Sequence, residues 1–290
     1  MRRRMDPLQS ALAAFELSLL LIGAFLLLRA LAQPTRRLAW FGANAIPPWA
    51  LTGFEVVMLI MLVFLCGFTG QFLASQIFAS HIKLSPDRAG LEVLVYGAAL
   101  HGCALLGWPL FARVRRWMYA DYGAVAVAVS PSPRLPLPQL LGSAFVAFIA
   151  ALPVITVLSL GWTLLLRKLG LPDEPQDLVE IFTKTQAPFI LTGMLLVACV
   201  LAPINEELIF RAGIFRSIRQ RHGRRAALVL SALAFGALHG NWAGFLPLTI
   251  FGAALALAYE KTGDIRVSIF AHACFNLNTI LIIYSGLPNL

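Results

Sequence analysis

Long apolar runs separated by short polar segments dominate this chain. A run of about 20 apolar residues crosses a bilayer as a helix, and on this criterion we expect about eight spans. The sequence therefore predicts an all-α, polytopic transmembrane helical bundle. The expected spans cover residues 11–32, 46–69, 91–112, 139–166, 188–210, 225–240, 244–260 and 265–285.

Polar residues qualify this pattern in four places. Residues 70–90 are too polar to span, and we expect them to lie at the membrane interface. Glu16 and Glu55 lie near the ends of their spans, where an exposed interfacial carboxylate is the simplest interpretation. His101, alone in the third span, is interpreted as a hydrogen-bonded packing residue. The basic and aromatic residues of 113–119 predict the point where that span meets the membrane surface.

A proline-rich stretch divides the chain. Residues 130–138 contain four prolines and cannot form a regular helix. We therefore expect residues 1–129 to form an accessory membrane region of about three spans by the same length criterion. Residues 139–290 are expected to form the functional core.

Composition and charge agree with a membrane protein. Of the 290 residues, 59% are hydrophobic and only 13% are charged, whereas a soluble domain has about 25% charged residues. The net charge of +9 comes from short basic clusters between apolar runs, which fits topology signals and anionic lipid rather than nucleic acid. The cysteines all lie in apolar segments and are interpreted as small buried hydrophobes, because no CxxC spacing occurs.

The distribution of lysine and arginine predicts an orientation. Basic residues collect after the first, third, fifth and seventh spans, which favours a cytoplasmic location for these loops and an outside N-terminus. Arg2, Arg3 and Arg4 point to the opposite orientation. No small-residue cleavage site follows the first apolar run, so we expect an uncleaved span there. The Arg- and Ala-rich composition favours a bacterial source and hence the inner membrane.

An acidic doublet stands at the end of an uncharged run. Residues 188–204 carry no charge, and Glu206 and Glu207 follow them after Asn205. A charged side chain at membrane depth costs at least ~2.5–3.5 kcal/mol, so the doublet needs a reason. Residues four apart share a helix face, which predicts an ion pair between Glu207 and Arg211. Glu206 points about 100° away without such a local partner, which suits a general base or acid.

Polar residues on two later spans are expected to meet Glu206. His239 lies about 20 Å along its helix from Arg225. His272 and Asn276 lie one turn apart on a single face. Taken alone, His272 and Asn276 are explained better by hydrogen bonding between helices. Together with Glu206 they supply what is needed to activate water and to hold an oxyanion.

These residues form the basis of a family resemblance. Glu206-Glu207-x-x-x-Arg211, then Phe235-x-x-x-His239, then His272-x-x-x-Asn276 resemble the three motifs of the CPBP intramembrane proteases. That family includes the type II CAAX prenyl endopeptidase of eukaryotes and bacterial proteins linked to bacteriocin processing or self-immunity. The resemblance covers roughly residues 139–290 and does not extend to residues 1–129.

The resemblance implies a role for each motif residue. Glu206 would polarise the attacking water, and His239 would help to hold that water. Glu207 and Arg211 would form the supporting pair. His272 and Asn276 would stabilise the oxyanion of the tetrahedral intermediate, and Phe235 would pack beside the cavity.

The resemblance leaves the cofactor open. Glu206, His239 and His272 would make an open zinc site with a fourth position for water. The HExxH sequence of many zinc proteases is absent from the chain. The family is commonly called metalloprotease, yet similar proteins are also described as metal-independent glutamate proteases. The expected cofactor is therefore either none or zinc.

The sequence is compatible with three functions. The favoured one is an intramembrane endopeptidase that cleaves a membrane-associated or lipidated protein or peptide, with the bilayer and this substrate as its partners. The second is a membrane scaffold or immunity protein that keeps the fold without needing hydrolysis. The third is a proton-coupled transporter, whose buried carboxylates and histidines relay protons. Transporters often show inverted repeats with broken helices, and none is visible here.

Overall fold

The computed structural model describes residues 6–35, 37, 46, 51–119, 134–174 and 177–285, without the side chains of 177–179 and 285. These residues form helices and no strand, so the predicted all-α fold is confirmed. Seven helical stretches among them are long and apolar enough to cross a membrane. The chain is an integral, multi-pass membrane protein. Arg2, Arg3, Arg4 and residues 130–133 of the proline-rich stretch lie outside the described residues.

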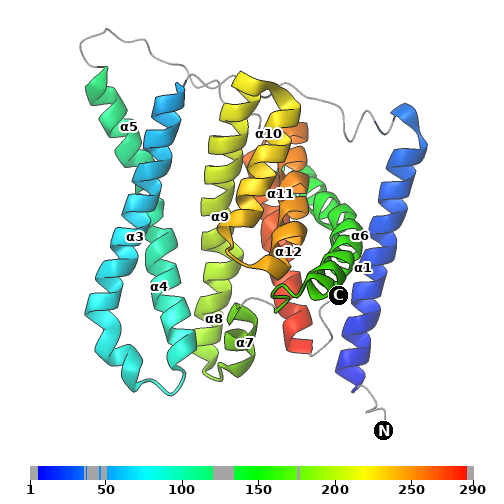
Figure 1. Cartoon of the computed structure of the whole chain (residues 1–290), viewed down its shortest axis with the longest axis horizontal. Coiled ribbons are helices and arrows are strands. Elements are labelled where there is room, and N and C mark those ends of the chain that lie inside the picture. Colours follow the sequence, from blue (N-terminus) through cyan, green and yellow to red (C-terminus); the bar gives the residue numbers. More distant parts are fainter. Residues whose placement is uncertain are drawn as a thin grey trace. The chain divides into compact units, whose positions relative to one another are not determined.

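The helices fall into two compact units, described separately. The first comprises residues 1–45, 133–183 and 228–290. Its helix α6 packs against three others of the unit (Figure 1). The helices of this unit are α1 (Pro7–Ala32), α6 (Leu137–Leu169), α7 (Asp177–Lys184), α11 (Trp242–Thr262) and α12 (Ile265–Ser285). The partners of α6 are α1, α11 and α12.

The second unit comprises residues 46–132 and 184–227. Helix α3 packs along α4 and α5, as Figure 1 shows, and α4 also contacts the segments that follow residue 187. The helices are α3 (Gly53–Leu84), α4 (Arg88–Ala104), α5 (Gly107–Met118) and α8 (Pro188–Leu196). Helix α9 (Ala202–Glu207) lies between two π-helical segments, η2 (Val197–Leu201) and η3 (Leu208–Phe215). Each unit thus combines residues from both halves of the chain, and the expected functional division at 130–138 stays a prediction.

Residues 70–84 continue the second span as helix, and the expected interfacial position of 70–90 stays a prediction. Helix α3 runs without interruption from Gly53 to Leu84 and carries those polar residues in its second half. At 32 residues it is about 48 Å long, against about 30 Å for the hydrocarbon core. A helix this long spans the core and still leaves its polar end outside it.

Glu16 and Glu55 are buried, and their expected exposure is also wrong. Glu16 is 6% exposed and accepts a hydrogen bond from Asn278 Nδ2 at 3.2 Å. Glu55 is 1% exposed and accepts from Arg115 Nε at 2.6 Å and from the Thr52 backbone N–H at 2.7 Å. Both carboxylates are tolerated in the fold because each has a partner from a distant or capping residue.

The run from Pro188 to Leu238 is one helical stretch of 51 residues by composition. A straight helix of that length would measure about 77 Å, more than twice the hydrocarbon core. Gly223, at φ 81° and ψ 174°, breaks α10 (Arg216–Leu238) near its middle. Only glycine adopts this conformation readily. The break divides this run into two parts. These two parts correspond to the expected spans at 188–210 and 225–240.

A polar clamp fixes the turn before α12. The Asp264 carboxylate accepts hydrogen bonds from the Leu135 N–H at 2.9 Å and from Arg266 Nη2 at 2.6 Å. Arg266 Nη2 also donates to the Leu135 carbonyl at 2.9 Å. The turn between α11 and α12 is thereby attached to the start of α6.

This clamp predicts an acid-sensitive contribution to stability. Burial alone would raise the pKa of Asp264, but hydrogen bonds from Arg266 and the Leu135 backbone hold it below its usual 3.8. A lowered pKa stabilises the fold at pH values above 3.8, and the stabilisation is lost as the pH falls through the lowered pKa. Asp264→Asn should cost roughly 2 kcal/mol at pH 7. Melting temperatures of both proteins in detergent should differ at pH 7 and converge in strong acid. A constant difference at all pH values would contradict this origin.

Candidate active site

The acidic doublet lies on a short helix with irregular neighbours. Helix α9 ends at Glu207, with π-helical segments immediately before and after it. Single π-helical turns are rare and are found frequently at functional sites. The expected span at 188–210 therefore does not end at the motif, because the helix continues through η3 into α10.

The predicted ion pair between Glu207 and Arg211 is confirmed. Arg211 Nη1 lies 3.0 Å from Glu207 Oε1, and the two side chains are 1% and 0% exposed. An isolated buried charge costs roughly several kcal/mol, so both side chains can be buried completely because their charges are opposite and paired. The ion pair with Arg211 thus holds the Glu207 side chain of the doublet in a fixed position.

Glu206 has charged surroundings of its own. The Arg211 guanidinium interacts electrostatically with Glu206 as well as with Glu207. The His101 imidazole on α4 also interacts with the Glu206 charge. The expectation that Glu206 lacks a nearby partner is therefore wrong. Glu206 as a residue is half-buried, whereas Glu207 is fully buried, although one carboxylate oxygen of Glu206, Oε2, is itself buried.

The sequence did not predict that His101 lies in this region. Asn205 Nδ2 donates to the His101 carbonyl at 3.1 Å and lies 3.4 Å from its Nδ1. Because a carbonyl needs a donor, this bond turns Asn205 Oδ1 away from His101. Oδ1 is buried and accepts no hydrogen bond from any described residue. The only sequence signal was a polar residue within an apolar span, since the contact joins residues 104 apart.

In the first unit, a tight turn positions His239. Helix α10 ends at Leu238, and Gly240 takes a φ of 61°, which closes the turn directly after His239. His239 Nδ1 lies 2.8 Å from the Phe235 carbonyl, which can only accept. Nδ1 therefore carries a proton and donates to this carbonyl. In the neutral form of such a ring, Nε2 is an acceptor of the kind that a water O–H requires.

His272 is buried among aromatic rings. It is 3% exposed, with ring centroids 5.7 Å from Phe235 and 5.4 Å from Phe251. Phe235 also contacts His239, with centroids 5.0 Å apart. Both predicted histidines thus pack against Phe235. The implied place of Phe235 beside a catalytic cavity stays a prediction.

The predicted residues are accounted for within each unit. Glu206, Glu207 and Arg211 lie together in the second unit. His239 and His272 lie together in the first, and Asn276 is one helical turn beyond His272 on α12. The meeting of Glu206 with these histidines in one cavity joins residues of different units and stays a prediction.

The zinc alternative gains no support. Among the described residues, no group of three or more His, Cys, Asp or Glu side chains could hold a metal ion. A metal site at Glu206, His239 and His272 would join residues of different units and stays a prediction. Cys66, Cys103, Cys199 and Cys274 form no disulfide with one another and are partly buried, in line with their interpretation as small apolar residues.

A family of membrane peptidases matches the segment that carries these residues. Residues 188–278 match the family described as Type II CAAX prenyl endopeptidase Rce1-like. The matched segment begins with α8 and includes all six predicted site residues. The resemblance to this family is thereby confirmed for the segment.

Two curated relatives extend the comparison. The chain is 34% identical over 88 residues to a Bacillus subtilis protein described as "Putative membrane peptidase YdiL". That match covers 30% of this chain and 36% of the relative, so the chain spans little more than a third of that protein. An Escherichia coli "Uncharacterized 24.3 kDa protein" is 26% identical over 192 residues, covering 62% of this chain and 80% of the relative. No solved structure matches the chain.

Proposed function

We propose that this protein is an intramembrane endopeptidase that hydrolyses a peptide bond of a membrane-associated or lipidated protein or peptide. The observation that carries the proposal is the match of residues 188–278 to a peptidase family, since this segment contains every predicted site residue. The bacterial inner membrane is the proposed location.

Glu206 is the proposed general base. Its carboxylate takes a proton from a water molecule, and the resulting hydroxide attacks the carbonyl carbon of the scissile bond. The same proton then passes to the leaving nitrogen, so that the products are a carboxylic acid and an amine. His239, whose Nδ1 is bound to the Phe235 carbonyl, is proposed to hold the attacking water through Nε2. Asn205 Oδ1, buried beside the doublet, is a second acceptor for that water.

His272 and Asn276 are the proposed oxyanion donors. A tetrahedral intermediate places a negative charge on the former carbonyl oxygen, and donors fixed beforehand stabilise it. The aromatic contacts of His272 restrict its ring orientation, which supports such a role. Glu207 and Arg211 act indirectly, by fixing the helix on which Glu206 stands.

The test is proteolysis by the purified protein in liposomes. The probes are a library of palmitoylated peptides and the same peptides without the acyl chain, analysed by mass spectrometry. We expect new peptide termini with the wild type and a loss of at least about 100-fold in His239→Ala. His81→Ala removes an exposed histidine of α3 and should retain full activity. A chelator and a measurement of bound metal decide the cofactor.

Other outcomes would favour the competing functions. If no peptide is cleaved and His239→Ala supports the full biological activity, a scaffold or immunity protein is favoured. Proton uptake by the liposomes without new termini would favour a transporter. Cleavage that survives in His239→Ala would remove this histidine from the mechanism.

His101 is proposed as a positioning residue for Glu206. Replacing it with phenylalanine keeps the bulk but removes the imidazole that interacts with Glu206. Because one modest polar interaction is lost, we expect kcat to fall about fivefold. KM should stay unchanged, since His101 contacts the motif rather than the substrate. His81→Phe is the matched control, and an unchanged kcat in His101→Phe would contradict the assignment.

A further inference from the structure

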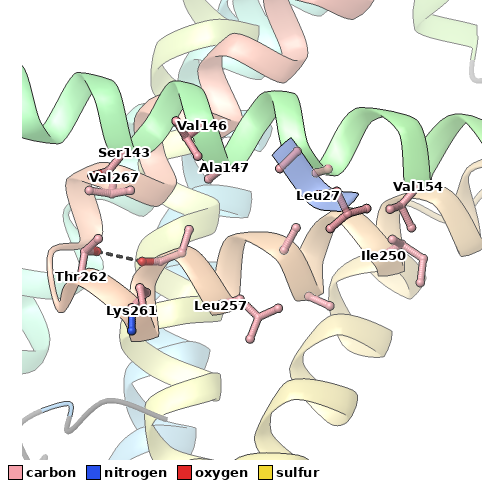
Figure 2. Close-up of a pocket in the computed structure, with 15 residues that line it drawn as sticks. Leu27, Ser143, Val146, Ala147, Val154, Ile250, Leu257, Lys261, Thr262 and Val267 are labelled. Atoms are coloured by element: carbon pink, nitrogen blue, oxygen red, sulfur yellow. Dashed lines mark hydrogen bonds between the residues drawn. The ribbon is translucent and has the colours of Figure 1, made fainter. Parts of the chain in front are cut away.

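A deep apolar crevice lies in the first unit, away from the site residues named above. It lies between α6 and α11, with Leu27 of α1 along one side (Figure 2). Its volume is about 510 Å³. The lining is apolar except for Ser143, Lys261 and Thr262. A space of this size and character is typical of a binding site for an apolar ligand.

Two matching stripes of small residues form its walls. Ala147, Ala150 and Ala151 of α6 line one side, and α11 contributes Ala253, Ala254 and Ala258 to the other. Their spacing places each set on one face of its helix. Because alanine extends no further than its methyl group, two packed helices leave open space between these faces. The sequence thus builds the crevice into both helices.

The crevice has the depth of one membrane leaflet. Its lining on α11 extends from Ile250 to Lys261, a rise of about 16 Å. Half of the hydrocarbon core of a bilayer is about 15 Å. Lys261 lies one residue before the end of α11, so the lysine marks the surface end of this slot. The opposite end, at Ile250 and Val154, is purely apolar.

The surface end opens into a more polar space. A second cavity of about 540 Å³ shares Ser143, Lys261 and Thr262 with the crevice and adds Gln139. The start of α6 at this mouth is already bound to the Asp264 carboxylate through the Leu135 N–H. The side chain that favours a further negative group is therefore Lys261, and Gln139 and Thr262 offer polar contacts to it.

We propose that the crevice binds one acyl chain of an anionic phospholipid, with the lipid phosphate held at the mouth by Lys261. The commitment to an anionic lipid rests on charge complementarity, because a positive group at the surface end of an apolar, leaflet-deep slot matches a phosphate joined to a hydrocarbon chain. Basic pockets between transmembrane helices bind anionic headgroups in this way. The inference is independent of the proposed peptidase activity.

Native mass spectrometry of the detergent-purified full chain tests this site. The probes are phosphatidylglycerol and phosphatidylcholine with identical acyl chains. We expect the wild type to prefer phosphatidylglycerol and Lys261→Gln to lose about fivefold of that preference. Lys261→Arg should restore it. Lys168→Gln, which removes an exposed lysine at the far end of α6, is the matched control and should change nothing.

A second variant tests the apolar slot. Ala254→Phe fills the crevice and should reduce binding of both lipids, while helical circular dichroism shows that the variant is folded. An unchanged preference in Lys261→Gln would overturn the headgroup assignment. Lipid binding that survives in a folded Ala254→Phe would overturn the crevice as the site. A dimer that Ala254→Phe dissociates, with lipid binding unchanged, would instead assign the crevice to a helix of a second copy.

Discussion

Replacing Glu206 with glutamine is expected to abolish peptide hydrolysis. Glutamine keeps the shape and hydrogen-bonding capacity of the side chain but cannot take a proton from water. General base catalysis contributes about 10²–10⁴-fold, and we expect a loss of that size in kcat/KM. Substrate affinity should change little, because the carboxylate acts on water. Initial rates with a peptide cleaved by the wild type, measured in liposomes, give the comparison.

The control for this variant is Glu174→Gln. Glu174 is an exposed glutamate of the loop before α7, so the same chemical change there should leave activity intact. Circular dichroism and the melting temperature should show both variants folded. If Glu206→Gln hydrolyses the peptide within a few-fold of the wild-type rate, Glu206 is not the base and the assignment of the doublet fails.

Replacing Arg211 with leucine is expected to destabilise the protein strongly. The buried guanidinium neutralises Glu207, which is 0% exposed, and its removal leaves a buried carboxylate without that cation. Breaking a buried pair in this way costs about 3–5 kcal/mol. We expect the melting temperature in detergent to fall by roughly 10 °C. The double variant Glu207→Gln with Arg211→Leu should recover most of the loss, because both charges are then absent.

A surface pair of the same spacing provides the comparison for Arg211. Arg88 and Glu92 on α4 also lie four residues apart, at 2.9 Å, but their side chains are 58% and 35% exposed. Exposed pairs contribute about 0–1 kcal/mol, so Arg88→Leu should hardly change the melting temperature. Equal effects of the two substitutions would mean that burial does not determine the strength of the Glu207–Arg211 pair.

The features predicted correctly were those with a local cause. Hydropathy alone placed α1, α6, α11 and α12 to within a few residues, because an apolar run of that length has little alternative in a membrane. Helical periodicity likewise predicted the pairing of Glu207 with Arg211, which depends only on residues within one turn.

The errors concern contacts between distant parts of the chain. Glu16 reaches Asn278 across 262 positions, and Glu55 reaches Arg115 across 60. Nothing near either glutamate in the sequence indicates these distant partners, although the spacing of Thr52 and Glu55 is that of a capping box. His101 is the same case at the candidate site, because its neighbour Asn205 belongs to another helix. The length of α3 was missed for a different reason, since helix continuity does not end where hydropathy falls.

The π-helical segments on either side of α9 make the doublet sensitive to chain length. A π-helical turn holds one more residue than an α-helical turn, and successive residues of a helix differ in direction by about 100°. If one residue of η2 were deleted, Glu207 would move into the direction that Glu206 now has, and Arg211 would turn with it. The ion-paired carboxylate would then point where Glu206 points now. In relatives that lack one residue before the doublet, we therefore expect the second glutamate to take the direction of Glu206.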